Sequence, residues 1–246
     1  MSILTDLRIA AVGDIHLGED GRGHYRRRLE GIEERADVFM LAGDLTRHGT
    51  LQEGKVVADE LRDLPIPAVA VLGNHDYHSD LQDEIADELR DAGVIVLDDD
   101  GVVLQCGDTK LGIVGGKGFG GGFAGKCASE FGEREIKNFV AHTRHIAEAW
   151  KVALKEIVAD ERVVLSHYSP VKETLEGEPP EIYPFLGSYL LAEAVDTAGA
   201  DLILHGHAHK GSPKGMTPGG IRVRNVALPV LGRAYGVYCL EYENGF

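Results

Sequence analysis

The sequence lacks the features that would indicate a membrane protein, a secreted protein or a disulfide-stabilised fold. Its 246 residues contain three cysteines, Cys106, Cys127 and Cys239, and none of them lies in a CxxC pair. An odd number of widely spaced cysteines favours free thiols over a disulfide framework. No apolar run reaches the roughly 18 residues of a membrane-spanning helix, and the amino terminus lacks the pattern of a signal peptide. We therefore expect a soluble, cytoplasmic protein without a membrane partner.

Basic charge is also scarce. The chain has 25 lysines and arginines against 40 aspartates and glutamates, and its formal net charge is −15. A protein that follows a nucleic-acid backbone usually carries a basic surface, so this balance argues against a nucleic-acid polymer as partner. A small anionic substrate remains compatible, because bound metal ions can dominate the local field. The sequence does not indicate an oligomeric state.

The remaining composition is that of a folded protein, with 43% hydrophobic residues and enough length for one large α/β domain over residues 1–246. In the first half, strands alternate with helices, which predicts parallel βαβ units. The close-spaced strands of Val94–Val114 and Ile221–Glu241 predict hairpins or meanders. Two mixed sheets flanked by helices would accommodate both patterns.

Apolar periodicity predicts the individual elements. The expected strands are Leu7–Val12, Val38–Ala42, Ala68–Leu72, Val94–Leu97, Val102–Gln105, Leu111–Val114, Val163–Ser166, Leu202–Leu204, Ile221–Asn225 and Tyr235–Glu241. The expected helices are roughly His24–Arg35, Leu51–Leu61, Asp80–Asp91, Glu133–Ala159 and Leu186–Ala198. The long amphipathic helix Glu133–Ala159 could pack on the sheet, cover the active site or form a dimer surface.

Five of these strands end in residues that bind metal ions. The motifs are Gly13-Asp14-Ile15-His16, Gly43-Asp44, Gly73-Asn74-His75-Asp76, His167 and Gly206-His207-Ala208-His209. Ligands of open α/β sheets bind beyond the carboxyl ends of the strands, so these five tips are expected to converge on one site. Alternate residues of an extended chain point to the same side, which would aim Asp14 with His16, and His207 with His209, into that site.

Seven side chains in these motifs are candidate metal ligands: Asp14, His16, Asp44, Asn74, His167, His207 and His209. Mixed oxygen and imidazole ligands suit manganese, the first choice here, and also iron, zinc, cobalt or nickel. Seven protein ligands are too many for one ion and fit two divalent ions that share one carboxylate. The two aspartates neutralise only half of the charge of two such ions, so the site would attract an anionic phosphate.

The ordered set D-x-H, G-D, G-N-H-[DE], H and G-H-x-H resembles the calcineurin-like metallophosphoesterase family, and it extends from Asp14 to His209. The resemblance implies a four-layer αββα sandwich of two mixed sheets, with a dimetal site at one sheet edge. It also implies two ligand sets that share Asp44 as the bridge: Asp14, His16, Asp44 and His209 for the first metal, and Asp44, Asn74, His167 and His207 for the second.

The same resemblance implies the hydrolysis of a phosphate ester by a hydroxide that bridges the two metals. By this resemblance His75 is the general acid, which protonates the leaving oxygen. Asp76 is then a candidate to orient His75, although it could equally cap a turn or hydrogen-bond a ligand histidine.

The bridging motif departs from one branch of the family. Protein Ser/Thr phosphatases continue it as G-D-x-V-D-R-G, whereas this chain reads Gly43-Asp44-Leu45-Thr46-Arg47-His48-Gly49. The second acid and the following arginine, which grips a dianionic phosphate, are replaced by Arg47 and His48. This favours a phosphodiesterase that acts on a small nucleotide or related ester. The alternatives are a phosphomonoesterase, including a protein phosphatase, and a non-catalytic metal-binding scaffold.

Two further patterns have competing interpretations. Residues 120–126 satisfy G-x-x-x-x-G-K, but Cys127 stands where a nucleotide-binding loop needs serine or threonine, so a mobile loop beside the site is favoured. Phe119 or Phe123 of this region could stack on a base or aryl group. His142 and His145 could bind a further metal, but a helix-packing or exposed role is favoured.

Overall fold

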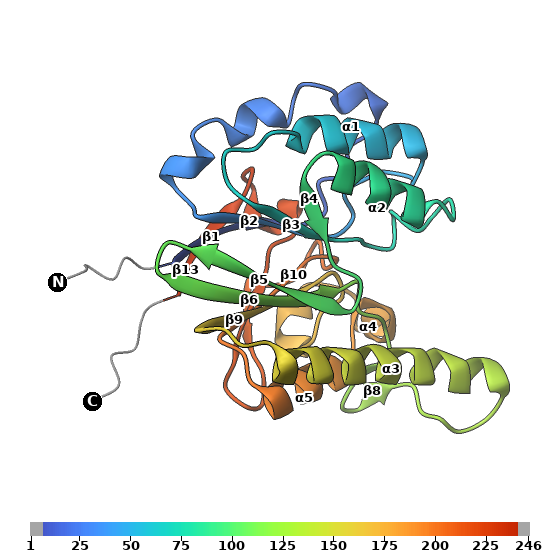
Figure 1. The fold of residues 1–246 in the computed structure, drawn as a ribbon. Helices are drawn as coiled ribbons and strands as arrows, with labels where there is room; N and C mark the ends of the chain where they lie inside the picture. The colour runs from blue at the N-terminus through green and yellow to red at the C-terminus, as the bar shows by residue number, and fades with distance from the viewer. Residues whose placement is uncertain (1–6, 241–246) are drawn as a thin grey trace.

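The computed structural model describes residues 7–240, which form two β-sheets packed face to face between two layers of helices (Figure 1). The first sheet has five strands in the order β13-β1-β2-β3-β4. All neighbours pair in parallel except β13, which runs antiparallel to β1. These strands are β1 (Leu7–Val12), β2 (Val38–Ala42), β3 (Ala68–Val71), β4 (Val94–Val96) and β13 (Gly236–Leu240).

The second sheet has six strands in the order β11-β12-β10-β9-β6-β5. Its four central strands are parallel, and the edge strands β11 and β5 are antiparallel to their neighbours. The strands are β5 (Asp100–Cys106), β6 (Thr109–Gly116), β9 (Glu161–Ser166), β10 (Leu202–His205), β11 (Lys214–Met216) and β12 (Arg222–Asn225). A small separate hairpin pairs β7 (Gly122–Phe123) with β8 (Lys126–Cys127).

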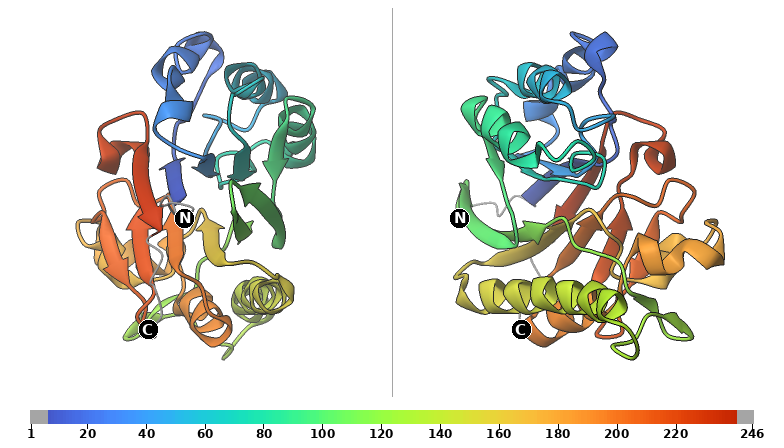
Figure 2. Two further views of the ribbon diagram at one scale, coloured as in Figure 1. Left: turned by 60° about the vertical axis from the view of Figure 1, so that its left-hand side comes forward. Right: turned by 90° about the vertical axis from the view of Figure 1, so that its right-hand side faces the viewer.

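Helices cover the outer face of each sheet, as both views of Figure 2 show. The first sheet is covered by α1 (Leu51–Leu61) and α2 (Gln82–Asp91), with 3-10 turns at Glu19–Gly21, Arg26–Leu29 and Ile32–Glu34. The second sheet is covered by α3 (Arg134–Glu156) and α5 (Tyr189–Ala198). Shorter elements are α4 (Tyr183–Leu186), α6 (Leu228–Leu231) and the 3-10 turns Lys172–Leu175 and Pro180–Ile182.

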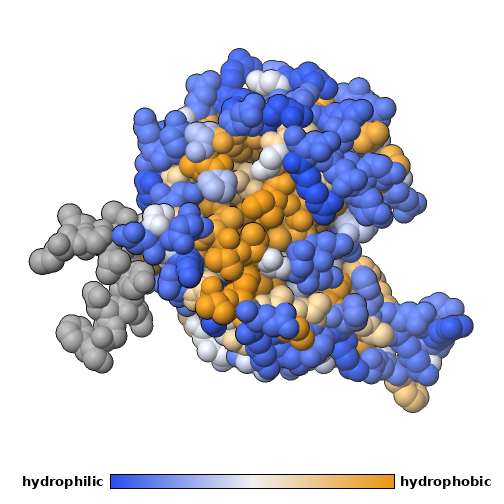
Figure 3. All heavy atoms as spheres, viewed as in Figure 1, coloured by the Kyte–Doolittle hydropathy of each residue, from blue (hydrophilic) through white to orange (hydrophobic). Residues whose placement is uncertain are grey.

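Three apolar clusters hold these four layers together. Alternate residues of β1 explain why: Ala10 and Val12 pack toward α1 and α2, whereas Ile9 and Ala11 pack between the sheets. A strand that is buried on both faces reads as a continuous apolar run, which is how Ile9–Val12 of β1 and the whole of β2 appear in the sequence. In the view of Figure 3, apolar surface lies in a band between polar surfaces above and below, where Figure 1 shows the sheets between the helices. The expected αββα sandwich of two mixed sheets is confirmed.

The long helix predicted around Glu133–Ala159 packs on the second sheet beside α5. Trp150 is fully buried on its inner face, and its indole Nε1–H donates to Asp99 Oδ1 at 2.8 Å. Among residues 7–240, no helix combines the length and apolar character that a membrane crossing needs. The three cysteines are free.

Two predicted helices differ in the structure. Residues 24–35 form two 3-10 turns instead of an α-helix, because Gly31 adopts a left-handed φ of 71° between them and only Leu29 and Ile32 of these turns are buried. The predicted helix Leu186–Ala198 is interrupted at Gly187, and α5 begins anew where the Ser188 hydroxyl accepts the Leu190 N–H.

The predicted hairpins were only partly right. β5 and β6 do form one, but β4 joins the first sheet by pairing with β3. The segment predicted as a hairpin over Ile221–Glu241 is split between the sheets, with β12 in the second and β13 in the first. The intervening helix α6 carries the chain across, a connection that strand spacing alone does not reveal.

Candidate metal centre

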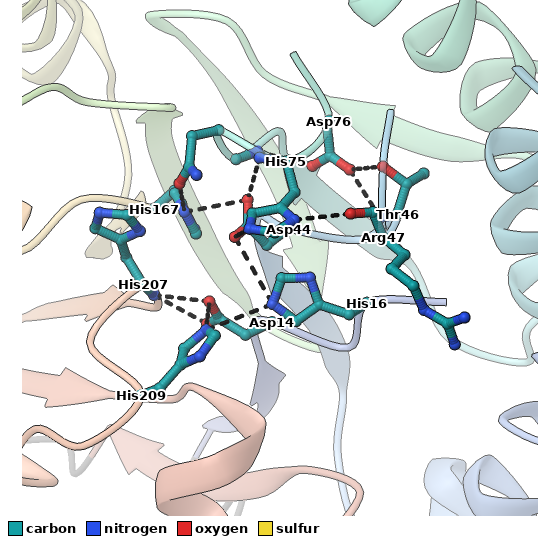
Figure 4. Close-up of polar contacts among 12 residues, drawn as sticks. Asp14, His16, Asp44, Thr46, Arg47, His75, Asp76, His167, His207 and His209 are labelled. Carbon is teal, nitrogen blue, oxygen red and sulfur yellow. Dashed lines mark hydrogen bonds and ion pairs between the residues drawn. The ribbon is translucent and has the colours of Figure 1, made fainter. Parts of the chain in front are cut away.

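The five predicted motifs meet at the carboxyl ends of β1, β2, β3, β9 and β10 (Figure 4). The first three strands belong to one sheet and the last two to the other. The candidate site therefore lies across the edge shared by the two sheets, and each sheet supplies part of it.

One group of donor atoms comes from Asp14, His16, Asp44 and His209, and these atoms all lie within 4.8 Å of one another. His209 Nε2 is 2.8 Å from Asp14 Oδ1 and 3.4 Å from His16 Nε2. His16 Nε2 is in turn 3.8 Å from Asp44 Oδ2. Here two imidazole nitrogens face each other beside two carboxylates. This set of nitrogen and oxygen donors suits a divalent cation of borderline softness.

A second group is formed by Asp44, His167 and His207, again within 4.8 Å. His167 Nε2 is 3.3 Å from Asp44 Oδ1 and 2.9 Å from Asn74 Oδ1. The other ring nitrogen, Nδ1, donates to the Ala42 carbonyl at 2.9 Å, so the lone pair of Nε2 faces the centre. Asp44 is common to both groups, which is what a bridging ligand requires.

Burial keeps several of these imidazoles in the neutral form that binds metals. It lowers the pKa of His167 well below its ordinary value, the pKa of His207 to about 3, and the pKa of His16. Burial raises the pKa of Asp14 to about 6, while the hydrogen bond to Asp14 raises the pKa of His209. Asp14 and His209 contact each other through the atoms that an ion would bind, so metal binding would compete with a proton there.

The backbone at four of the candidate ligands is left-handed. The φ angles are 58° at Asp14, 42° at His16, 51° at Asp44 and 70° at His207. Such angles are uncommon outside glycine and persist where the surroundings enforce them, often at functional sites. The expectation that an extended chain aims these residues was therefore wrong. Left-handed turns aim them instead, held by hydrogen bonds such as Asp14 N–H to the Gly43 carbonyl at 2.9 Å.

Glycines before the ligands allow close approach of the loops. Gly43 has a φ of 79°, and a Cβ on it would lie 2.7 Å from His167 Nδ1. A Cβ on Gly73 would lie 2.2 Å from Asp44 Oδ1. Any larger residue at these positions would displace a donor, so the glycines set the spacing of the centre.

Asp76 is fully buried and ties two ligand loops together. Its carboxylate accepts the N–H groups of Leu45, Thr46 and Gly73 at 3.2, 2.8 and 2.8 Å, and the Thr46 hydroxyl at 2.6 Å. Burial, and then the charge of Asp44, raise its pKa to about 6. Asp76 thus fastens the loop after β2 to the loop after β3.

His75 takes its orientation from elsewhere. Its Nδ1 donates to the Arg47 carbonyl at 2.8 Å, in place of the expected contact with Asp76. Its Nε2 lies 3.9 Å from Asp44 Oδ2, and its side chain is 44% exposed at the rim of the centre. A backbone carbonyl leaves no signature in a sequence, so this partner of His75 could not have been predicted.

The two residues that depart from the protein-phosphatase motif have other partners. The Arg47 guanidinium pairs with Asp20 at 3.1 Å, and His48 Nδ1 lies 3.1 Å from Glu53 Oε1. The sequence analysis also missed Tyr168, whose ring centroid is 4.4 Å from that of His207. Its position directly after His167 was the available signal.

The other sequence patterns do not contribute donors. Residues 120–127 enter the β7–β8 hairpin, and the next helix begins only at Arg134, so the strand–loop–helix arrangement of a nucleotide-binding loop is not formed. The ring of His142 packs on Phe119 at 4.7 Å between centroids. Within residues 7–240, the two groups described above are the clusters of histidine and acidic side chains that could hold a metal ion.

Comparison with known proteins agrees with this geometry. Residues 7–211 match the family described as calcineurin-like phosphoesterase, and no curated protein matches the sequence. The fold resembles that of phosphopantetheinyl hydrolase from Mycobacterium tuberculosis, with a TM-score of 0.66, 14% identity and 98% of each chain covered. Two further similar structures are TT1561 of Thermus thermophilus (TM-score 0.59, 15% identity, 96% and 100% covered) and a phosphatase from Mycoplasma pneumoniae (0.53, 14%, 91% and 72%). At these identities the likeness concerns the fold alone.

Proposed function

The chain belongs to the calcineurin-like phosphoesterase family, and from this premise we propose that it is a dinuclear phosphodiesterase that acts on a small nucleotide or a related phosphate ester. The proposal that two metal ions bind rests on the position of Asp44, whose buried carboxylate belongs to both donor groups. The preference for a diester is supported by Arg47. In protein phosphatases an arginine of this motif binds the dianionic phosphate of a monoester. In this chain the Arg47 guanidinium pairs with Asp20 instead and does not take over that role.

The residues present fit two divalent ions. Asp14, His16, Asp44 and His209 would hold one, and Asp44, Asn74, His167 and His207 would hold the other, with manganese as the first candidate. When bound, such a pair of ions supplies Lewis-acid stabilisation of the phosphoryl oxygens and a water of lowered pKa. The protein's own contribution is to fix these donors on left-handed turns and to keep the buried imidazoles neutral.

His75 is proposed as the proton donor. Its Nδ1–H is engaged by the Arg47 carbonyl, so the ring presents Nε2 toward the centre beside Asp44. At the partly exposed rim, Nε2 can deliver a proton to the leaving oxygen of an ester whose phosphate occupies the centre.

The proposed function is tested by stripping the protein of metal and adding back Mn²⁺, Fe²⁺, Zn²⁺, Co²⁺ or Ni²⁺ in turn. We expect hydrolysis of bis-p-nitrophenyl phosphate to return with at least one ion, and kcat/KM to exceed that for p-nitrophenyl phosphate. Faster cleavage of the monoester would favour a phosphomonoesterase. Absence of hydrolysis of both esters with all five ions would favour a non-catalytic scaffold.

The proton-donor role predicts a dependence on the leaving group. For His75→Asn, kcat/KM should fall about 10²–10⁴-fold on a diester with an alkyl leaving group, which needs a proton, and far less on one that releases p-nitrophenol. The matched control is His78→Asn, an exposed histidine in the same loop. Equal losses of kcat/KM on both esters would contradict a role as general acid. They would indicate that the substitution disturbs the position of Asp44, which accepts the His75 backbone N–H.

A further inference from the structure

One lysine beside the candidate metal centre has no partner for its hydrogen-bond donors among the described residues. Lys117 directly follows β6, and its Nζ lies 4.8 Å from the ring centroids of both Tyr77 and Phe119 and 5.4 Å from that of Tyr168. Among residues 7–240, Nζ makes no hydrogen bond and no ion pair. Three aromatic faces stabilise an ammonium by cation–π attraction, but they leave its three N–H donors without strong acceptors.

Negative charges near this ammonium do not pair with it. Asp98 and Asp99 are close enough to act on Lys117 electrostatically, as is Asp44. Asp99 Oδ1, however, accepts the indole N–H of Trp150 at 2.8 Å, and Asp44 is a donor of the metal centre. Lys117 is thus a half-buried cation, and its donors remain available for a ligand.

Tyr168 connects this cation to the second donor group. Its ring centroid lies 4.4 Å from that of His207 and 5.6 Å from that of His167. The Lys117 carbonyl accepts the N–H groups of His167 and Tyr168 at 3.1 and 3.0 Å, which fixes the position of the lysine relative to the centre. Within the part of the chain that the structure describes, the Tyr168 hydroxyl also has no hydrogen-bond partner. The Tyr168 ring therefore adjoins both the Lys117 ammonium and the candidate ligand His207.

We infer that Lys117, with Tyr168, forms a subsite for a second anionic group of the substrate, namely a phosphate carried on the part of the molecule that is esterified to the scissile phosphate. This inference rests on the proposed function, since it assumes that the scissile phosphate occupies the metal centre. An ammonium with three free donors matches the acceptor-rich oxygens of a phosphate, and Tyr168, whose ring centroid is 5.4 Å from Nζ, can add a hydroxyl donor. The partly exposed rings of Tyr77 and Phe119 beside this ammonium give apolar surface to the sugar or base that links the two phosphates. The substrate class is then a nucleotide with two separate phosphate groups.

The test compares two esters with the same leaving group: thymidine 5′-(p-nitrophenyl phosphate) and its 3′-phosphorylated derivative. The metal-loaded protein should prefer the 3′-phosphorylated ester by roughly 10–100-fold in kcat/KM, as expected for a charge-assisted hydrogen bond. Lys117→Met should remove most of this preference and change cleavage of the unphosphorylated ester by less than about 3-fold. Lys117→Arg should retain a preference. Lys110→Met, at the exposed opposite end of β6, is the matched control.

A binding measurement keeps the subsite separate from catalysis. Calorimetry should show tighter binding of thymidine 3′,5′-bisphosphate than of thymidine 5′-monophosphate, with the difference reduced in Lys117→Met and, to a smaller extent, in Tyr168→Phe. If neither ester is hydrolysed with any metal, the proposed function fails while calorimetry still decides the subsite. Equal losses on both esters would place Lys117 at the scissile phosphate, and an unchanged preference in Lys117→Met would exclude it from the subsite. Either result overturns the inference.

Discussion

Replacement of Asp44 by asparagine should lower kcat/KM for the metal-dependent hydrolysis of bis-p-nitrophenyl phosphate by about a thousandfold, because several kcal/mol of charge stabilisation would be lost. Asp44 is the one residue that the two donor groups of residues 7–240 share. The change keeps the shape of the side chain but removes its charge, and its NH₂ group would face His16 or His167 in place of a carboxylate oxygen. Metal analysis should show fewer than the two ions expected for the wild type.

The control for this variant is Asp80→Asn. Asp80 shares the left-handed backbone of Asp44, with a φ of 55°, but its side chain is exposed. We expect it to retain both ions and full activity. If Asp44→Asn bound two ions and hydrolysed the diester at the wild-type rate, Asp44 could not be a bridging ligand.

Replacement of Asp76 by alanine should destabilise the metal-free protein by about 3–5 kcal/mol. The carboxylate satisfies four donors from Leu45, Thr46 and Gly73, and removing the acceptor from buried donors costs about 1–3 kcal/mol each before water compensates. Urea unfolding followed by the fluorescence of Trp150 would measure the loss. Asp87→Ala, an exposed aspartate on α2, should change stability by no more than about 0.5 kcal/mol.

The same variant separates two roles of Asp76. If it fastens the loops after β2 and β3, stability falls, and excess metal restores part of it through binding to the folded state. A loss confined to kcat, with the unfolding midpoint unchanged, would instead mean that Asp76 orients His75.

The sequence was sufficient to predict which candidate donors the structure brings together, but not the way in which they are held. Each motif follows an apolar strand that is visible as a continuous run, and the carboxyl ends of such strands gather at one edge. The φ of 58° at Asp14, by contrast, depends on a hydrogen bond to Gly43, which another strand contributes. Interactions of this kind arise only in the assembled sheet, so periodicity and motif spacing do not predict them.

The incorrect or incomplete predictions from the sequence have the same origin, namely contacts that form only in the folded chain. Residues 24–35 resemble a helix by propensity, yet Gly31 interrupts them. The cluster around Lys117 draws its rings from three separate segments, at Tyr77, Phe119 and Tyr168, and nothing in their spacing links them. The role of Asp76 was open because an acidic residue beside His75 suits both orientation and loop fastening until its partners are known.

The candidate metal centre lies across two sheets, and this would couple metal binding to the stability of the fold. Asp14 and Asp44 follow strands of one sheet, whereas His167 and His207 follow strands of the other. An ion held by both sets would act as a crosslink between layers that otherwise adhere through apolar contact. Binding energy then appears as resistance to unfolding, about 2.7 kcal/mol when free ion exceeds its dissociation constant a hundredfold. If the site binds metal as proposed, the stability of the folded chain would depend on metal supply, and metal depletion would weaken the association of the two sheets at the edge that carries the candidate ligands.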